Sequence, residues 1–280
     1  MISARVSVSR LLMTLNPDPD TFFVRKIILT QVIAVAGKGG TGKTTLSALV
    51  IRYLKKKGYG PILAVDADPN ANLADALGLN AEKSLGGARE EFFESKMNLP
   101  PGMAKETYLE MKVHETLVES PGLDLLVMGR PEGPGCYCYA NNILRRHIDQ
   151  LARNYPFVVM DNEAGMEHLS RRTTQGVDHL LFLSDYSIKG IRTVGKIREL
   201  IADLKLAVKE KHLVVDRAPG ELAAGFQQEI QKQGVELLGI IPVDNTIFEY
   251  DLQGKSLLDL PDESPAVERV AGMMEKMIRV

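Results

Sequence analysis

Uninterrupted apolar runs alternate along this chain with stretches in which apolar residues recur every three or four positions. The uninterrupted runs predict buried strands at Ile27–Ala36, Pro61–Val65, Leu123–Met128, Phe157–Met160, His179–Leu183, His212–Val215 and Leu237–Ile241. The other pattern predicts helices at Lys43–Lys57, Asn72–Leu77, Ala140–Asn154, Met166–Thr174, Ile188–Leu206, Glu221–Gln233 and Pro265–Arg279. Apolar strands separated by amphipathic helices are typical of a parallel sheet covered on both faces. We therefore expect an α/β, doubly wound, mostly parallel fold.

No linker-like segment divides the chain, so we expect one domain from residue 29 to residue 280. The most polar long stretch, Ala81–Val113, predicts a helical insertion within it. Residues 1–28 are expected to form a loosely ordered arm. The arginines and serines of that arm, without acids up to Asn16, are also weakly typical of a transit peptide.

Composition narrows the classes of function. The 280 residues carry 34 basic and 36 acidic side chains, a formal charge of −2 that argues against a broad nucleic-acid-binding surface. No apolar run approaches the about 18 residues of a membrane span. Two cysteines without a secretory segment predict a reducing, cytoplasmic location. We accordingly expect neither nucleic acid nor membrane as a partner.

A phosphate-binding loop is the most specific motif in the chain. Residues 37–45 read GKGGTGKTT and fit G-x-x-x-x-G-K-[ST], between an apolar run and a helical pattern. Glycines let successive backbone N–H groups point at phosphate oxygens, and the helix N-terminus adds positive charge. The Lys43 ammonium is expected to contact β- and γ-phosphates, and the Thr44 hydroxyl to bind Mg²⁺. The predicted nucleotide contacts in this loop are Gly39, Gly40, Thr41, Gly42, Lys43, Thr44 and Thr45.

Carboxylates follow two of the predicted strands. Asp66 and Asp68 come after Pro61–Val65, where doubly wound sheets bind ligands, although Asp-Pro-Asn is also ordinary turn chemistry. Asp161 ends the run FVVMD, a Walker B pattern, and is expected to hold Mg²⁺ through water. Gly165 follows shortly after, where a backbone N–H can contact the γ-phosphate.

The only two cysteines form a C-x-C pair, Cys136 and Cys138. Side chains two residues apart in extended backbone project to the same side, so both thiolates can bind one soft metal ion. Because zinc takes four ligands, two such pairs brought together in a symmetric dimer would complete an S₄ site. A tetrahedral site suits Zn²⁺ and a planar one suits Ni²⁺. Buried packing thiols or a strained disulfide are the alternatives.

Four segments together resemble the nickel-insertion accessory ATPases of carbon monoxide dehydrogenase and acetyl-CoA synthase. They are GKGGTGKTT, DADPNAN, the stretch from Met128-Gly129-Arg130 to Cys136-Tyr137-Cys138, and MDNEAGMEHLSRR, within a similarity that spans about residues 30–265. Lys38, at the second position of the loop, is typical of the deviant Walker A motif. That motif is shared with partition and cell-division-site ATPases, the nitrogenase iron protein and metallochaperones.

The resemblance implies roles for several residues. Lys38 would reach across a homodimer to the partner's nucleotide, the alternative being a solvated loop lysine. Asp68 would orient the hydrolytic water, and Asp66 would support the metal. The resemblance therefore makes Lys38, Lys43 and Asp68 the catalytic candidates.

Two later segments resemble the part of the family that binds the base. Pro242, Val243 and Asp244 match a Pro-x-Asp stretch that flanks adenine, and Asp216 and Arg217 stand where the family has Asn followed by Arg. This chain departs from the pattern at Asp216. A carboxylate can accept a hydrogen bond from the adenine 6-amino group but cannot donate one to N7.

The sequence hence predicts a homodimeric, Mg²⁺-dependent ATPase that binds nickel, or zinc in its place, through Cys136 and Cys138. Its expected client is carbon monoxide dehydrogenase or acetyl-CoA synthase. The alternative is a partition or positioning ATPase that acts on membrane or DNA. The pattern of residues 265–280 fits either a membrane-binding amphipathic helix or a helix docked on the core.

Overall fold

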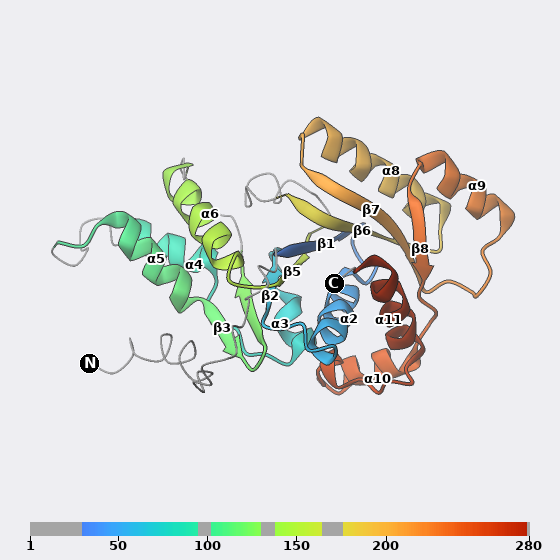
Figure 1. Ribbon diagram of the computed structural model, residues 1–280, viewed down its shortest axis with the longest axis horizontal. Coiled ribbons are helices and arrows are strands. Elements are labelled where there is room, and N and C mark those ends of the chain that lie inside the picture. The colour runs from blue at the N-terminus through green and yellow to red at the C-terminus, as the bar shows by residue number, and fades with distance from the viewer. Residues whose placement is uncertain (1–29, 95–101, 130–137, 164–175, 279–280) are drawn as a thin grey trace, which may run out of the picture.

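A computed structural model of the protein describes residues 30–94, 102–129, 138–163 and 176–278. Within these residues one sheet has the strand order β3-β4-β2-β5-β1-β6-β7-β8 (Figure 1). Its strands are β1 (Gln31–Gly37), β2 (Ile62–Asp66), β3 (Leu117–Ser120), β4 (Leu123–Val127), β5 (Phe157–Asp161), β6 (Val177–Asp185), β7 (Val208–Asp216) and β8 (Glu236–Ile240). Every described pair is parallel except β3 with β4. The expected α/β, mostly parallel fold is confirmed.

Helices cover both faces of the sheet. The described helices are α2 (Lys43–Lys56), α3 (Asn72–Leu77), α4 (Leu85–Glu94), α5 (Lys105–Glu115), α6 (Cys138–Ala152), α8 (Ile188–Asp203), α9 (Ala224–Gln233), α10 (Asn245–Leu252) and α11 (Pro265–Met277), with a short 3₁₀ turn at Leu257–Asp259. Apolar residues of α2, α3 and α11 pack on one face, and those of α4, α5, α6, α8 and α9 pack on the other. Because both faces are buried, the central strands are apolar throughout.

The strand register brings distant segments together at the carboxyl edge of the sheet. Asp66, at the end of β2, pairs with Asp161, at the end of β5. Gly37 ends β1 opposite Leu183 of β6, and a Cβ atom at Gly37 would lie 2.2 Å from the Leu183 carbonyl oxygen. Only glycine fits this close backbone approach, so the loop after β1 starts directly against β6.

The structure differs from several predicted elements. Helix α9 begins at Ala224 and not at Glu221, and α6 begins at Cys138 and not at Ala140. Strand β7 begins at Val208, because the charged residues 209–211 lie on an exposed strand end whose sequence does not look apolar. Strand β3 is a short edge strand with only two apolar residues, and α10 has no buried residue, so neither produces a core pattern. Residues 27–29 of the first predicted strand and the predicted helix Met166–Thr174 lie outside the described residues.

Helix α11 is docked on the core. Its buried residues are Ala266, Val267, Val270, Met273, Met274 and Met277, and they belong to the same cluster as the apolar residues of α2. The apolar face that also fitted a membrane-binding helix is therefore covered by the protein itself. None of the described helices is both long enough and apolar enough to span a bilayer.

Candidate functional site

The loop between β1 and α2 presents backbone N–H groups at a helix N-terminus. Gly40 and Gly42 adopt left-handed conformations, with φ of 76° and 89°, which glycine allows without strain. Among the described residues no side chain caps the start of α2, which begins at Lys43. Its first-turn N–H groups are therefore available, together with the helix dipole, for an anion.

The two lysines of the loop differ in their surroundings. Lys43 is only 8% exposed, and its Nζ lies 3.5 Å from the Lys38 carbonyl oxygen, which also accepts a 2.7 Å hydrogen bond from the Thr41 hydroxyl. The loop thus encloses the Lys43 ammonium. The Lys38 side chain is partly buried and forms no hydrogen bond or ion pair with any described residue. It is the lysine whose ammonium is not engaged by its own loop.

Asp161 is held by two hydroxyl groups of α2. The Thr44 hydroxyl donates to Asp161 Oδ2 at 2.6 Å, and the Ser47 hydroxyl donates to Oδ1 at 3.3 Å. Burial raises the pKa of the Asp161 carboxyl from 3.8 to about 6, and the Thr44 hydrogen bond opposes that rise. Ser47 was missed from the sequence, although its position one turn after Thr44 places it on the same helix face.

Asp66 is completely buried beside Asp161. Its carboxylate accepts hydrogen bonds from the backbone N–H groups of Asp68, at 3.0 Å, and Leu73, at 2.9 Å. Burial raises its pKa to about 7, and the charge of Asp161 adds to the rise. The charge of Lys43 opposes the rise in the pKa of Asp161 but does not cancel it. Two buried carboxylates and the Thr44 hydroxyl offer hard oxygen ligands, which is the donor set that suits Mg²⁺.

Asp68 lies in a turn at the edge of this cluster. Its Oδ1 accepts hydrogen bonds from the backbone N–H of Asn70, at 2.9 Å, and from the Asn70 side-chain amide, at 3.0 Å. Its charge is close enough to raise the pKa values of both Asp66 and Asp161. The turn chemistry expected as an alternative is present, and the side chain stays partly exposed beside the buried pair.

Asp216 and Arg217, at the end of β7, meet the loop from its other side. The Arg217 guanidinium donates to the Gly40 carbonyl oxygen at 2.9 Å and lies 3.2 Å from Asp216 Oδ2. A Cβ atom at Gly42 would come within 2.9 Å of the same Asp216 oxygen. Arg217 has a φ of 51°, a left-handed conformation that is uncommon for a residue other than glycine. Burial raises the pKa of Asp216, and Arg217 opposes this.

The segment of Pro242, Val243 and Asp244 serves the fold in a way that the sequence did not reveal. Asp244 caps α10 by accepting from the Thr246 N–H at 2.9 Å, and its other oxygen accepts from the Ser264 hydroxyl at 2.5 Å and the Ala266 N–H at 3.1 Å. Both carboxylate oxygens are thus used inside the protein. Val243 is 65% exposed.

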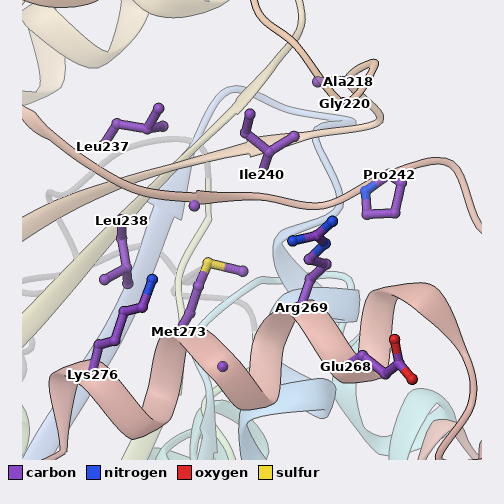
Figure 2. Close-up of a pocket in the computed structure, with 12 residues that line it drawn as sticks. Ala218, Gly220, Leu237, Leu238, Ile240, Pro242, Glu268, Arg269, Met273 and Lys276 are labelled. Carbon is purple, nitrogen blue, oxygen red and sulfur yellow. The ribbon is translucent and has the colours of Figure 1, made fainter.

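Pro242 also borders a pocket of about 320 Å³ at the sheet edge formed by β8 and α11 (Figure 2). Figure 2 shows Met273 reaching up from α11 beneath β8, with Arg269 extending toward Pro242. No residue of the phosphate loop lines this pocket. It is therefore separate from the cluster of carboxylates.

The structure describes most, but not all, of the residues that the sequence predicts for the site. The phosphate loop, Asp66, Asp68, Asp161, Asp216 and Arg217 come together at one edge of the sheet. Cys138 is the first residue of α6, and the structure does not describe its side chain. Cys136 and Gly165 lie outside the described residues.

Together, a phosphate loop at the end of a central strand and a carboxylate at the end of the neighbouring strand define a P-loop nucleotide-binding protein. Sequence comparison makes the class more specific. Residues 32–258 match the CobQ/CobB/MinD/ParA nucleotide binding domain, and the chain belongs to this family of ATPases.

Individual relatives agree with this assignment. The chain is 45% identical over 250 residues to an uncharacterized ATP-binding protein of Methanocaldococcus jannaschii, covering 89% of this chain and 98% of that one. It is 34% identical over 252 residues to the carbon monoxide dehydrogenase accessory protein CooC of Rhodospirillum rubrum, covering 84% and 90%. The fold resembles a ParA family ATPase from Chlorobium tepidum, with a TM-score of 0.67 at 20% identity over 86% of this chain and 97% of that one.

Ionisation of Asp161 should make stability depend on pH. Folding raises the pKa of Asp161 to about 6, so the carboxyl ionises less readily in the folded protein than in the unfolded chain. Ionisation of Asp161 therefore lowers the free energy of unfolding progressively as pH rises from about 4 to about 6. Asp161→Asn removes that cost. In nucleotide-free, Mg²⁺-free protein, its free energy of unfolding relative to wild type should be higher at pH 8 than at pH 4, by on the order of 2 kcal/mol.

Urea unfolding of both proteins at the two pH values measures this difference. The pH dependence reports the ionisation of the buried pair, because the charge of Asp161 also raises the pKa of Asp66. An Asp161→Asn effect of equal size at pH 4 and pH 8 would contradict the assigned pKa shift.

Proposed function

We propose that the protein is a homodimeric, Mg²⁺-dependent ATPase that binds nickel through Cys136 and Cys138. In this proposal it helps insert nickel into carbon monoxide dehydrogenase or acetyl-CoA synthase. The observation that carries the ATPase part is the contact of Thr44 with Asp161 beside buried Asp66, directly after the phosphate loop. The similarity to the CooC protein of Rhodospirillum rubrum supports the accessory role.

Each residue of the site has a distinct task in the proposed hydrolysis of ATP to ADP and phosphate. The loop N–H groups and Lys43 bind the phosphates, while Thr44, Asp161 and Asp66 would hold Mg²⁺, which neutralises phosphate charge when bound. Asp68, partly exposed at the rim of the cluster, orients the attacking water. Lys38, whose ammonium no described residue engages, contacts the partner subunit's nucleotide and stabilises charge that develops on its phosphates.

Base recognition in this proposal comes from the segment that follows β7. The contact of Arg217 with the Gly40 carbonyl brings this segment against the loop, and Asp216 accepts from the adenine 6-amino group. Pro242 and Val243 flank the base. Asp244 supports them indirectly, because its carboxylate ties the start of α10 to the start of α11.

Nickel binding rests on the chemistry of the C-x-C pair. Two thiolates from each subunit would complete a four-sulfur site that suits a soft ion. ATP binding closes the dimer in this scheme, hydrolysis opens it, and the geometry of the shared metal site changes with the dimer.

A positioning ATPase is the second candidate, favoured by the resemblance of the fold to ParA and MinD structures. Two observations count against it. The apolar face of α11 is buried on the core and so is not presented to a bilayer. The formal charge of −2 does not favour binding to DNA.

Substitutions at Lys43 and Asp68 should separate binding from chemistry. Lys43→Ala removes the enclosed ammonium and should abolish tight ATP binding. Asp68→Ala should leave ATP affinity within about threefold of wild type and reduce hydrolysis by at least about a hundredfold, because Asp68 orients water and does not hold phosphate. Isothermal titration and a phosphate-release assay measure the two quantities. Normal turnover in Asp68→Ala would refute the proposed role of Asp68.

A residue that acts across the dimer should be replaceable in trans. A heterodimer of one Lys38→Ala subunit and one Asp68→Ala subunit contains one intact composite site and one doubly defective site. A one-to-one mixture should therefore recover about a quarter of wild-type ATPase activity, since half of the dimers are mixed and each has one working site. Each variant alone should be inactive. No recovery, in a sample shown by mass spectrometry to contain heterodimers, would rule out the role in trans.

The thiolate site should bind about one nickel ion per dimer at high affinity, with thiolate-to-metal charge-transfer absorption. Cys136→Ser and Cys138→Ser should each remove that absorption and leave ATP hydrolysis close to wild type, because the thiols are not part of the phosphate loop or the carboxylate cluster. Absorption titration with Ni²⁺ and the phosphate-release assay check both points. Charge-transfer bands that persist after both substitutions would exclude a cysteine site.

A further inference from the structure

Three side chains with metal-binding atoms gather on β6 and β7, away from the phosphate loop. His179 lies near the start of β6, and Glu210 and His212 lie on β7. The parallel register pairs His179 with Glu210 and places His212 opposite Leu181, two residues further along. Side chains two residues apart on a strand share a face, so the cluster forms across the two strands. One donor atom from each of the three lies within 4.8 Å of the other two.

The distances within this cluster match those between neighbouring ligands of one metal ion. Glu210 Oε2 lies 3.2 Å from Nδ1 of His179 and 3.3 Å from Nε2 of His212. A tetrahedral site with bonds of about 2.0–2.1 Å separates adjacent ligand atoms by roughly 3.3–3.4 Å. The carboxylate oxygen is therefore already spaced from both imidazole nitrogens as two edges of such a tetrahedron require.

Hydrogen bonding leaves part of the cluster unsatisfied. Nδ1 of His179 is buried and has no hydrogen-bond partner within the described part of the chain, although Glu210 Oε2 lies 3.2 Å away. His179 itself is only 9% exposed. A buried polar atom without a partner is costly, and a cation bound between the imidazole and the carboxylate would use its lone pair. The side chain of Glu210 is 57% exposed, which leaves the cluster open to solvent on that side.

One of the two lysines that flank Glu210 in sequence is paired with a carboxylate. Lys209 lies next to Glu210 in sequence, but its ammonium forms a 2.6 Å ion pair with Asp178. The second oxygen of Asp178 accepts a hydrogen bond from the Val32 N–H at 2.7 Å. The charge of Lys209 is therefore balanced by Asp178. Lys211, on the other side of Glu210 in sequence, is exposed, and neighbouring strand residues project to opposite faces.

We propose that His179, Glu210 and His212 form a second metal site, which binds one divalent ion of borderline softness such as Zn²⁺ or Ni²⁺. Two imidazoles and a carboxylate suit these ions, whereas Mg²⁺ and Ca²⁺ require a shell made of oxygen atoms. Three protein ligands leave a fourth position for water or for a ligand that donates or accepts the ion.

This site is distinct from the cysteine pair. Leu181 and Val214, which project to the same face as the histidines, pack with α2 and α11. Helix α6, which begins at Cys138, packs on the opposite face of the sheet. The two sites also differ in ligand chemistry, so either can be present without the other.

The test uses the full chain with Cys136→Ser and Cys138→Ser, so that only the proposed second site competes for added Zn²⁺. Titration against a chromophoric chelator should give one Zn²⁺ per chain. Adding Glu210→Gln, which keeps the size of an exposed side chain, or His212→Ala should weaken binding by at least roughly tenfold. His114→Ala, which removes an exposed histidine of α5, is the matched control and should change nothing. Circular dichroism melts verify that each variant is folded.

Three outcomes of the Zn²⁺ titration would overturn the site: no Zn²⁺ bound by the cysteine-free chain, unchanged affinity after both Glu210→Gln and His212→Ala, or equal weakening by His114→Ala. Co²⁺ provides a spectroscopic readout. Intense visible bands without thiolate charge transfer support a low-coordinate nitrogen and oxygen site, and the weak bands of hydrated Co²⁺ contradict it. Failure of the cysteine proposal is distinguishable, because it shows as equal metal uptake with and without the two cysteines.

Discussion

Asp66 and Asp161 lie opposite each other at the carboxyl ends of β2 and β5, and both carboxylates are buried. Two buried negative charges side by side cost free energy, and burial raises the pKa of Asp66 to about 7 and that of Asp161 to about 6. Hydrogen-bond donors from three segments stabilise the two carboxylates. Backbone N–H groups of Asp68 and Leu73 serve Asp66, and hydroxyl groups of α2 serve Asp161.

This arrangement couples the phosphate loop to the turn that follows β2. Thr44 stands at the first turn of α2 and contacts Asp161, while Asp66 accepts from Leu73 in the first turn of α3. A cation near the phosphates would therefore act on both helix starts through a single pair of carboxylates. Arg217 adds a third connection by joining the end of β7 to Gly40. The loop thus contacts the ends of strands on both sides of β1. A phosphate that binds to the loop or leaves it would therefore act directly on residues at those strand ends.

Ligand chemistry separates the metal sites proposed for the molecule. Hard oxygen donors gather at the carboxyl ends of the strands, where Mg²⁺ and phosphate are expected. The histidine and glutamate cluster lies on the face covered by α2 and α11, and it combines nitrogen with oxygen donors. In sequence, the two cysteines stand at or just before the start of α6, a helix that packs on the other face. Different donor sets prefer different ions, so a borderline ion and Mg²⁺ would bind at separate places without any change of conformation.

Local patterns were sufficient to predict the fold class, most strand positions and the phosphate loop, because each depends on residues close together in sequence. Asp161 was recognisable for the same reason, as an acid that ends an apolar run. Side-chain partners were not predictable in this way. The contact of Ser47 with Asp161, the capping of two helices by Asp244, and the meeting of His179 with Glu210 and His212 depend on strand order and register. These bring together residues far apart in the chain, and neither apolar periodicity nor motif spacing records which strands become neighbours.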